Sequence, residues 1–372
     1  MKYIALKDVC KINMGQSPDS SSYNDNGDGI PFFQGNADFG ERYPVTRVWC
    51  NAPTKIAQPE DILISVRAPI GALNLAKEEC CIGRGLAALT PDRSKVSLEF
   101  IYWLLKGKKV ELNSKGTGST FKAISRKVLE ETMVPAIDFD KQHEYAEILE
   151  KIYSVIQKRK EELSALDDLI KARFVEMFGD PSTNPKGYPV KVLPEIAEYW
   201  NGLTYKPEDV SDEGTIVLRS SNIQNATLDF ADTVRVSCKI GDKKYVQDND
   251  ILMCSRNGSA RLVGKVALIK DIEEPMSFGA FMMIIRSDYY PYLMTYFQMP
   301  AFRAQITTGA TTTINQITGR MLDIVKLPVP DMDVINEFSD FVHQVDKSKV
   351  AVQKSLDETQ QLFDSLMQEY FG

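Results

Sequence analysis

Cysteine and histidine are the side chains that most often hold metals or act as nucleophiles, and this chain of 372 residues has only six cysteines and two histidines. The cysteines include no Cys-x-x-Cys pair, which a structural zinc site would need. They are also too sparse for a disulfide framework. We therefore expect no metal ligands and six small, buried, reduced thiols in a cytoplasmic protein: Cys10, Cys50, Cys80, Cys81, Cys238 and Cys254.

Sequence motifs that carry catalysis are missing as well. The chain has no "NPPY" or "DPPY" tetrad for amino-group methylation, no phosphate-binding "GxxxxGK[ST]" loop and no Gly-rich cofactor loop after a strand. The segment "NPKG" at 184–187 lacks the second proline of the methylation tetrad. We expect no catalytic residues and no cofactor on this chain.

An internal repeat organises the chain. Its ending, "QEYFG", resembles "VEMFGDP" at 175–181, and the two copies align without a gap from Ile124 and Ile317 onward. Earlier blocks follow in the same order: "LKDVCKINMG" with "LPEIAEYWNG", "IPFFQGNA" with "IVLRSSNI", and "DILISVRA" with "DILMCSRN". A period of about 190 residues indicates two copies of a whole domain rather than a solenoid. His143 and His343 are not equivalent in this alignment, so a shared role is not expected.

Each copy has two parts. The first contains short apolar or alternating runs bounded by Gly, Asp, Asn or Pro, which predict strands of a mixed domain. The second is a stretch of about 38 residues without proline or glycine, whose apolar residues recur every three or four positions. This pattern predicts two long amphipathic helices, the first of which ends at Gly179 before Pro181 and Pro185.

The two predicted helices should pack against each other. A helix of about 57 Å, at 1.5 Å per residue, cannot bury its apolar stripe on one small domain. We expect an antiparallel coiled coil; the alternative is that each stripe folds back on its own domain. The fold class is then α+β, with two tandem mixed α/β domains each followed by a long helix. The predicted boundaries are 1–139 for the first domain, 140–179 for the central helix, 180–332 for the second domain and 333–372 for the C-terminal helix.

The charge of the chain does not point to a function. A net charge of −7 argues against a nucleic-acid binder, which is usually basic. Most of the acidic excess, however, lies in residues 308–372, whereas residues 1–116 are slightly basic. No apolar run reaches the length of a signal peptide or a membrane span, so we expect no membrane association.

Taken together, the repeated motifs resemble those of the specificity subunit of type I restriction–modification systems, over essentially the whole chain. The resemblance lies in the "DIL…SR" blocks at 61–67 and 250–256, and in the "TGST" and "TGATTT" turns before "KAISRKVL" and "NQITGRML". The helix exit "MFGDP…NPKG" followed by "VKVLPEIAEYWNG" belongs to the same pattern. None of these motifs is specific alone.

This resemblance implies a non-catalytic, sequence-specific DNA-binding subunit. In that family the two domains are target recognition domains, and each reads one half of a bipartite, asymmetric DNA site. The helices fix the half-site spacing and dock two methyltransferase subunits, which bind S-adenosylmethionine, and motor-nuclease restriction subunits join for restriction. The implied partners are therefore double-stranded DNA and these subunits, with no cofactor on this chain and no membrane.

Reading DNA requires Arg, Asn, Gln, Ser or Thr side chains that reach base edges, while Lys, Ser, Thr and backbone amides hold phosphates. Three clusters of such residues lie at predicted strand ends in each copy. In the first copy they are Gln34 and Asn36; Ser65 and Arg67; and Lys115, Ser119, Thr120 and Lys122. In the second they are Arg219, Ser220 and Asn222; Ser255, Arg256, Asn257 and Arg261; and Thr311, Thr312 and Thr313.

Several of these candidates have a structural alternative. Asn36 and Asn222 could cap turns, and the "TGST" and "TGATTT" turns could be plain loops. Arg67 and Arg256 align with each other, although domains that read different half-sites should differ at base-reading positions. We expect this pair to hold phosphate or a structural carboxylate. The positions that differ, Gln34 against Ser220 and Phe33 against Arg219, are better candidates for base choice.

Two rival functions stay open at this point. One is the recognition portion of a fused restriction–methylation enzyme, against which the missing methylation and nuclease motifs argue. The other is a coiled-coil scaffold that displays two ligand-binding β domains and does not bind DNA. The modest charge also suits a DNA binder whose partner methyltransferases supply much of the phosphate neutralisation.

Overall fold

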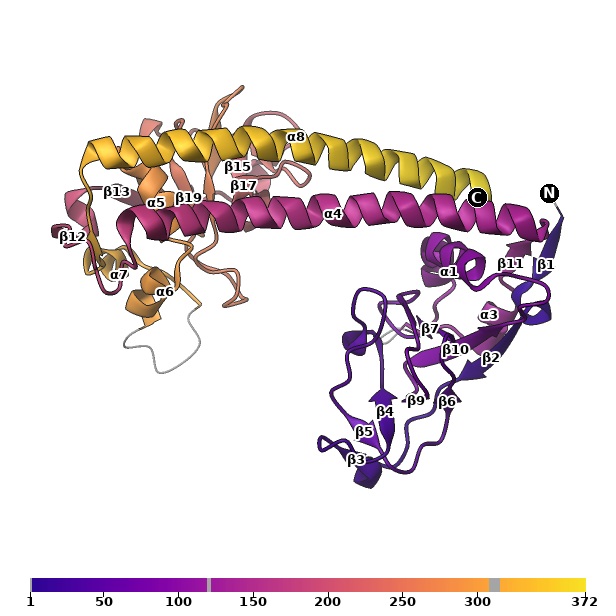
Figure 1. The fold of residues 1–372 in the computed structure, drawn as a ribbon. Coiled ribbons are helices and arrows are strands. Elements are labelled where there is room, and N and C mark those ends of the chain that lie inside the picture. Colours follow the sequence, from indigo (N-terminus) through magenta and orange to yellow (C-terminus); the bar gives the residue numbers. More distant parts are fainter. Residues whose placement is uncertain (1, 119–121, 308–314) are drawn as a thin grey trace. The chain divides into compact units, whose positions relative to one another are not determined.

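The computed structural model describes residues 2–118, 122–307 and 315–372. The chain forms two compact units: unit 1 is Met1–Lys160 together with Gln353–Gly372, and unit 2 is Glu161–Val352. Each long helix therefore contributes one segment to each unit (Figure 1). Within the described ranges, no helix combines the length and the apolar character that a membrane crossing requires.

Unit 1 is centred on a four-stranded antiparallel sheet in the order β2-β10-β7-β8. A second sheet, in the order β3-β5-β4-β9-β6, contains the parallel pair β4–β9, and β1 pairs with β11. The strands are β1 Tyr3–Ala5, β2 Cys10–Met14, β3 Tyr23–Asn24, β4 Ile30–Phe33, β5 Trp49–Cys50, β6 Ile56–Ala57, β7 Ile62–Ser65, β8 Leu73–Leu75, β9 Cys80–Ile82, β10 Leu86–Pro91 and β11 Met133–Pro135. The short helices are α1 Leu98–Gly107, α2 Lys109–Ser114 and α3 Arg126–Glu130.

Unit 2 repeats this arrangement. Its sheets have the orders β13-β22-β19-β20 and β14-β18-β15-β21, the second with a parallel β15–β21 pair, and β12 pairs with β23. The hairpin β16–β17 follows β15 and has no counterpart among the described strands of unit 1. The strands are β12 Val190–Val192, β13 Glu198–Asn201, β14 Val210–Ser211, β15 Thr215–Leu218, β16 Ile223–Gln224, β17 Thr227–Leu228, β18 Arg235–Val236, β19 Ile251–Cys254, β20 Val266–Leu268, β21 Met276–Phe278, β22 Met282–Arg286 and β23 Lys326–Pro328. The short helices are α5 Tyr290–Tyr296, α6 Pro300–Thr307 and α7 Gly319–Asp323.

Strand register confirms the duplication. Pro135 lies opposite Tyr3 in the β1–β11 pair, and Pro328 lies opposite Val190 in the β12–β23 pair. The central strands β7 and β19 consist of buried residues throughout, which explains their continuous apolar runs. The two copies therefore share one mixed α/β topology, as the repeat predicted.

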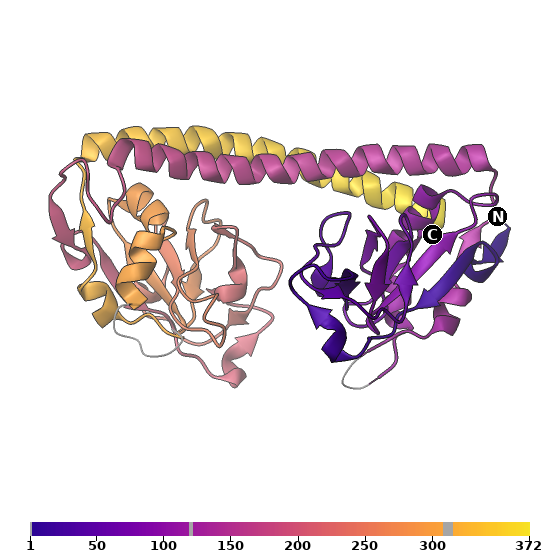
Figure 2. The same ribbon diagram turned by 60° about the horizontal axis from the view of Figure 1, so that its bottom comes forward.

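The long helices of the prediction are α4 (Phe139–Phe178) and α8 (Met332–Phe371), which lie side by side in both views (Figures 1 and 2). In unit 1, the rings of Tyr145 and Tyr370 stack with centroids 3.8 Å apart. Further along α4, Tyr153 approaches Phe363 with a centroid distance of 6.2 Å. Rising numbers on α4 meet falling numbers on α8, so the pair is antiparallel here.

The segments of the same helices in unit 2 are also antiparallel. Asp167 pairs with Lys349 at 2.6 Å, and Arg173 pairs with Glu337 at 2.9 Å. The helix α4 ends where Gly179 adopts a φ of +76°, a conformation that glycine enters without strain. The expected antiparallel pairing and helix stop are thus confirmed.

Each helix pair also packs on a globular part, but not as the alternative supposed, because α8 contacts the first domain in unit 1 and α4 contacts the second domain in unit 2. In unit 1, the Trp103 ring of α1 meets Tyr153 of α4 at 5.3 Å and Phe363 of α8 at 5.7 Å between centroids. In unit 2, Phe174 of α4 stacks on Tyr292 at 5.0 Å. The apolar stripe is therefore wide enough to contact both the partner helix and a domain core.

Candidate nucleic-acid interface

In unit 1 the three predicted clusters approach one another at one edge, through the turn between β9 and β10. The amide of Gly85 in this turn donates to the carbonyl of Gln34 (3.2 Å), and its own carbonyl accepts from Val66 N–H (2.9 Å). The carbonyl of Val66 in turn accepts from Ile124 N–H (2.9 Å). Backbone hydrogen bonds thus join the segments that carry Gln34, Arg67 and Lys122.

Unit 2 assembles the equivalent segments in the same way, around the turn between β21 and β22. The amide of Gly279 donates to the carbonyl of Leu218 (2.9 Å), directly before Arg219. Phe281 O accepts from Ser255 N–H (2.9 Å), and Ser255 O accepts from Ile317 N–H (2.7 Å). The same edge therefore forms twice, although its four backbone segments are far apart in the sequence.

One further segment, which the site prediction missed, packs against this turn through a glycine. Gly15 N–H donates to Leu86 O (2.9 Å), and a Cβ on Gly15 would lie 2.2 Å from Gly83 O. In unit 2, a Cβ on Gly202 would lie 2.1 Å from Phe278 O. The aligned blocks "KINMG" and "EYWNG" share this glycine, which was the available signal.

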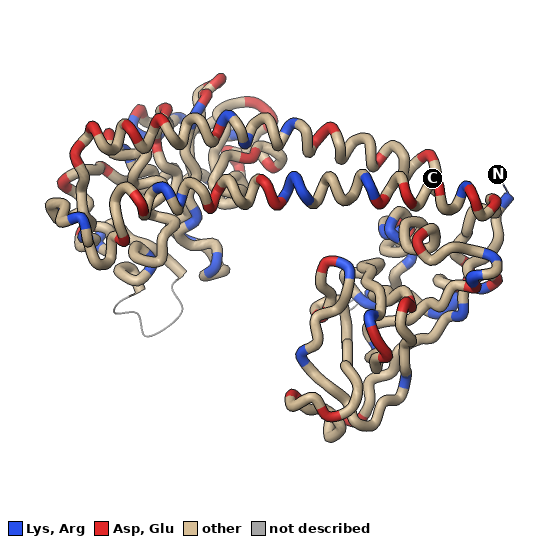
Figure 3. Tube along the Cα trace, in the orientation of Figure 1, with Lys and Arg blue, Asp and Glu red and all other residues tan. Residues whose placement is uncertain are grey.

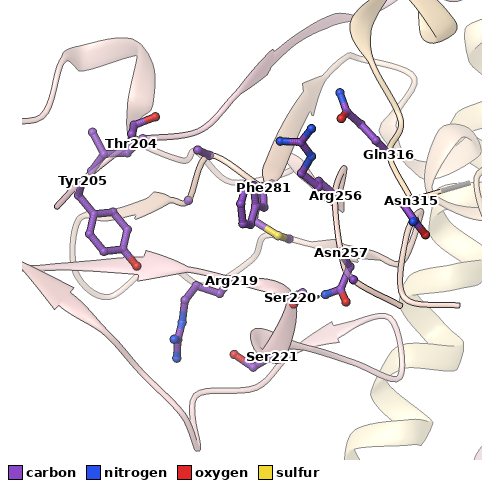
Figure 4. A pocket seen from close by; sticks show the side chains of 15 residues that line it. Thr204, Tyr205, Arg219, Ser220, Ser221, Arg256, Asn257, Phe281, Asn315 and Gln316 are labelled. Atoms are coloured by element: carbon purple, nitrogen blue, oxygen red, sulfur yellow. Dashed lines mark hydrogen bonds between the residues drawn. The ribbon is translucent and has the colours of Figure 1, made fainter. Parts of the chain in front are cut away.

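The edge of unit 2 encloses a pocket of about 840 Å³ (Figure 4). Four predicted residues line it, namely Arg219, Ser220, Arg256 and Asn257. Asn257 Nδ2 donates to Ser220 Oγ at 3.1 Å, which links two of the predicted clusters directly. Prediction missed Tyr205, Phe281 and Gln316 in the lining. Gln316 stands in the block "NQITGRML", which was used only for the resemblance.

The two arginines of this pocket are held differently. Arg219 Nη2 forms an ion pair with Asp232 Oδ2 at 2.8 Å. Arg256 forms no ion pair with any described residue, and its guanidinium lies 5.7 Å from the centre of the exposed Phe281 ring. In Figure 4, Phe281 lies between Arg219 and Tyr205 on one side and Arg256 and Gln316 on the other. Arg256 therefore offers an uncompensated charge, whereas Arg219 offers an oriented one.

Arg67 and Arg256 occupy equivalent positions, as the alignment indicated. Arg67 bridges Ala123 through its backbone, and Arg256 bridges Gln316. The side chain of Arg67 is exposed and has no carboxylate partner in the described part of the chain. Of the two alternatives for this pair, a structural carboxylate thus finds no support here, and phosphate contact stays a prediction.

Three predicted residues are buried and bonded within the chain. Ser65 Oγ donates to Pro69 O (2.6 Å) and accepts from Ala72 N–H (2.9 Å). Ser255 Oγ donates to Phe281 O (2.9 Å). Asn222 is fully buried and bonds three backbone groups, which is the turn-capping alternative. These side chains shape the edge rather than face a ligand.

The remaining candidates lie near the surface. Gln34, Lys122 and Arg261 are exposed and Asn36 is half-buried, while exposed Lys115 is paired with Glu111 at 2.6 Å. The turn-capping role suggested for Asn36 belongs to Asp38, whose Oδ2 accepts from Gln34 N–H at 2.7 Å. Ser119, Thr120, Thr311, Thr312 and Thr313 lie outside the described residues.

The alignment around the first cluster needs a correction of one residue. Phe33 lies opposite Ile82 in the β4–β9 pair, and Leu218 lies opposite Phe278 in the β15–β21 pair. Phe33 is therefore equivalent to Leu218, and Gln34 is equivalent to Arg219. The gapless sequence alignment paired Phe33 with Arg219 because the connection from Gly202 to Leu218 is shorter than that from Gly15 to Phe33, and a gapless block cannot follow this difference.

No arrangement for metal or thiol chemistry appears in the described ranges. They contain no group of three His, Cys, Asp or Glu side chains that could hold a metal ion. Cys238 is half-buried and the other five cysteines are buried, and burial raises the pKa of the Cys10 and Cys80 thiols to about 12. The Cys10 and Cys80 thiols therefore stay protonated at neutral pH.

Basic and acidic residues are interspersed along α4 and α8 (Figure 3).

Comparison with known proteins agrees with this architecture. The family model described as "Type I restriction modification DNA specificity domain" matches residues 1–165 of this chain. The whole chain also shares its fold with the crystallised type I restriction–modification system S subunit from M. genitalium. That alignment covers 100% of this chain and 96% of the other, with a TM-score of 0.58 and 15% identity.

Curated relatives carry the same description. The chain is 46% identical over 152 residues to the "Putative type I restriction enzyme MjaX specificity subunit" of Methanocaldococcus jannaschii, which covers 41% of this chain and 36% of the relative. It is 26% identical over 178 residues to the EcoKI specificity subunit of Escherichia coli, covering 44% and 38%. The chain thus spans less than half the length of these relatives. The resemblance to type I specificity subunits is confirmed.

Proposed function

We propose that this chain is the DNA-sequence specificity subunit of a type I restriction–modification complex and performs no catalysis itself. Each unit reads one half of a bipartite, asymmetric DNA site through the edge described above. The observation that carries this proposal is the repetition of that edge: it forms in unit 1, where the DNA specificity family matches, and again in unit 2 with different side chains. Two different reading surfaces on one backbone suit an asymmetric target.

The partners follow from the same proposal. Two methyltransferase subunits dock on α4 and α8 and bring S-adenosylmethionine, and motor-nuclease subunits join them, all in the cytoplasm. Several large apolar side chains of these helices are exposed. They are Val155, Leu169, Val175, Val350 and Leu362, with exposures between 42% and 70%.

The test is to purify the chain alone and together with the methyltransferase subunits of its host. The chain alone should bind DNA weakly and methylate nothing, because partner subunits supply phosphate contacts and chemistry. The complex should methylate one bipartite motif, read by long-read sequencing. Methylation by the chain alone would favour the fused-enzyme alternative. If neither preparation binds DNA and pull-down returns other proteins, the scaffold alternative is correct.

The helix pair is also proposed to act as a spacer. Lengthening α4 and α8 by one turn each adds about 5.4 Å. At roughly 3.4 Å per base pair, the unspecified spacer of the methylated motif should grow by one or two pairs. The two half-sites themselves should not change, which serves as the internal control. An unaltered spacer would rule out this role of the helices.

A further inference from the structure

We infer that Arg219 contacts a guanine in the half-site of unit 2, and that Asp232 is the positioning residue that orients its guanidinium. This inference rests on the proposed function and specifies one base contact within it. The observation behind it is the ion pair between Arg219 and Asp232 at the pocket of unit 2. Asp232 belongs to none of the sequence motifs and lies on the loop after the β16–β17 hairpin.

The ion pair fixes one side of the arginine. Nη2 of Arg219 lies 2.8 Å from Asp232 Oδ2, and the Arg219 side chain is 35% exposed, compared with 65% for Asp232. The Nε atom of Arg219 is buried and makes no hydrogen bond in the described structure. A guanidinium carries five N–H donors in a rigid plane. Once Asp232 has taken one of them, the terminal nitrogens still have donors for a ligand.

One buried amide holds both members of the pair. Asn222 is fully buried, and its Oδ1 accepts from the backbone N–H of Arg219 at 2.8 Å. Its Nδ2 donates to the carbonyls of Asp229 (2.8 Å) and Asp232 (2.9 Å). The loop that carries Asp232 cannot shift against Arg219 without leaving buried polar groups unpaired, which is unfavourable. The ion pair is therefore a built feature rather than a chance surface contact.

An oriented, partly neutralised arginine suits a base better than a phosphate. Phosphate contact depends on charge and tolerates many orientations, and a neighbouring carboxylate weakens it. Guanine, by contrast, offers O6 and N7 as two acceptors in a plane, and bidentate arginine is their common partner in the major groove. Arg256 has no such carboxylate and recurs as Arg67, so the phosphate role fits Arg256 instead.

The position of Arg219 also meets the requirement for base choice. Strand register places Arg219 and Gln34 at the same point, directly after the parallel strand of each unit. Two units that read different half-sites should differ at a base-reading position, and here they do. Glutamine at this point cannot present a charged fork, so the guanine contact would be confined to unit 2.

The experiment uses the complex of the full chain with its methyltransferase subunits. A random duplex library first selects the bound sequence, which defines the probe. Each guanine of the unit 2 half-site is then replaced in turn by 7-deazaguanine, which lacks N7. One replacement should weaken wild-type binding about tenfold. The same replacement should have no further effect on Arg219→Ala. Lys239→Ala, which removes an exposed charge outside the pocket, is the control and should keep the wild-type response.

Asp232 is tested through selectivity rather than affinity. Asp232→Asn should lower the preference for guanine over adenine at that base pair about fivefold, without weakening binding to unrelated DNA. Asp232→Glu should recover part of the preference. A purely structural role would instead lower the melting temperature and weaken all binding together.

Two results would overturn the inference. Arg219→Ala could weaken binding to all sequences alike and flatten the salt dependence, which would make Arg219 a phosphate contact. Alternatively, Arg219→Ala could select the wild-type motif unchanged. A wild-type complex that selects no sequence at all would refute the proposed function and not only this contact.

Discussion

Units 1 and 2 differ in side chains at an edge where their backbones agree. Matched amide–carbonyl bonds hold the turn between two strands against its neighbours in both units. The turn itself reads Gly83-Arg84-Gly85 in unit 1 and Gly279-Ala280-Phe281 in unit 2. Hydrogen bonds and close contacts constrain the backbone of this turn, whereas substitutions of its exposed side chains change the stability of the fold little. Binding preference can therefore diverge between two copies that keep one fold.

A second difference lies beneath this edge, at a buried aspartate. In unit 2, both carboxylate oxygens of Asp250 accept from Arg286, at 2.6 and 2.7 Å. The equivalent Asp61 of unit 1 is 4% exposed, and its Oδ1 has no hydrogen-bond partner in the described part of the chain. Strand register places Thr90 of β10 where unit 2 has Arg286. The two copies therefore satisfy the same buried group to different extents.

The largest effect is expected from substitutions that disrupt the backbone packing shared by the two units. Gly15→Ala and Gly202→Ala should each lower the free energy of unfolding of their own unit by about 3 kcal/mol, because the new methyl group overlaps a carbonyl oxygen. Each should also abolish reading of one half-site only. Urea unfolding and motif selection measure the two effects. For stability, Gly35→Ala and Gly241→Ala are matched controls, since no atom lies within 4 Å of the added carbon. Equal stability of all four variants would contradict the close packing.

Substitutions next to the buried aspartates should change stability by a smaller amount, with opposite sign in the two units. Arg286→Met should destabilise unit 2 by about 2 kcal/mol, because Asp250 loses its partner while Arg286 itself is partly exposed. Thr90→Arg should stabilise unit 1 by up to about 1 kcal/mol by supplying Asp61 with a donor. Chemical denaturation reports both values. Destabilisation by Thr90→Arg would show that unit 1 has no room for the arginine.

Base choice can be exchanged at the equivalent position after the parallel strand. Gln34→Arg should shift one base pair of the first half-site towards guanine, with a change in preference of about tenfold. The second half-site should stay as it is. Selection from a random duplex library measures both half-sites at once, and Lys127→Ala on the exposed face of α3 is the control. If Gln34→Arg leaves the first half-site unchanged, positions 34 and 219 do not have the same function.

The smallest effect concerns a lysine of unit 1. Burial lowers the pKa of Lys106 to about 8, from an ordinary 10.5, although its Nζ lies 3.6 Å from the centre of the Tyr153 ring. A lysine with a lowered folded pKa costs stability in full below pH 8, and the cost disappears between pH 8 and 10.5. Lys106→Met should therefore stabilise unit 1 near neutral pH by less than about 1 kcal/mol, because the cation–π contact offsets part of the cost. A stability difference that stays constant from pH 7 to above 10 would disprove the shift.

Sequence reasoning went furthest where the pattern is local or repeated. The three- and four-residue period predicted α4 and α8, and the positive φ of Gly179 ends α4 where the sequence placed the stop. The repeat predicted two copies of one domain. The sequence alignment of the two copies was wrong by one residue at Gln34 and Arg219, because loops of different length displaced it. Strand pairing gives the correct register.

The candidate nucleic-acid interface shows the limit of that reasoning. Polarity and position marked Ser65, Asn222 and Ser255 as candidates, yet all three are buried and bonded to backbone groups. Asp232 carried no signal, since one aspartate in a polar loop resembles any other. Whether a polar side chain faces solvent or the backbone depends on what packs over it, and that partner lies elsewhere in the chain.

The sequence by itself determined the duplication, through blocks repeated in the same order. It also determined the two long helices and their pairing, because their periodic apolar residues must be buried. Tertiary structure alone decided which side chains share the pocket of unit 2, which arginine is oriented and which buried aspartate is paired. These features depend on hydrogen bonds between segments far apart in sequence. Local residue pattern does not encode such distances; the packed backbone does.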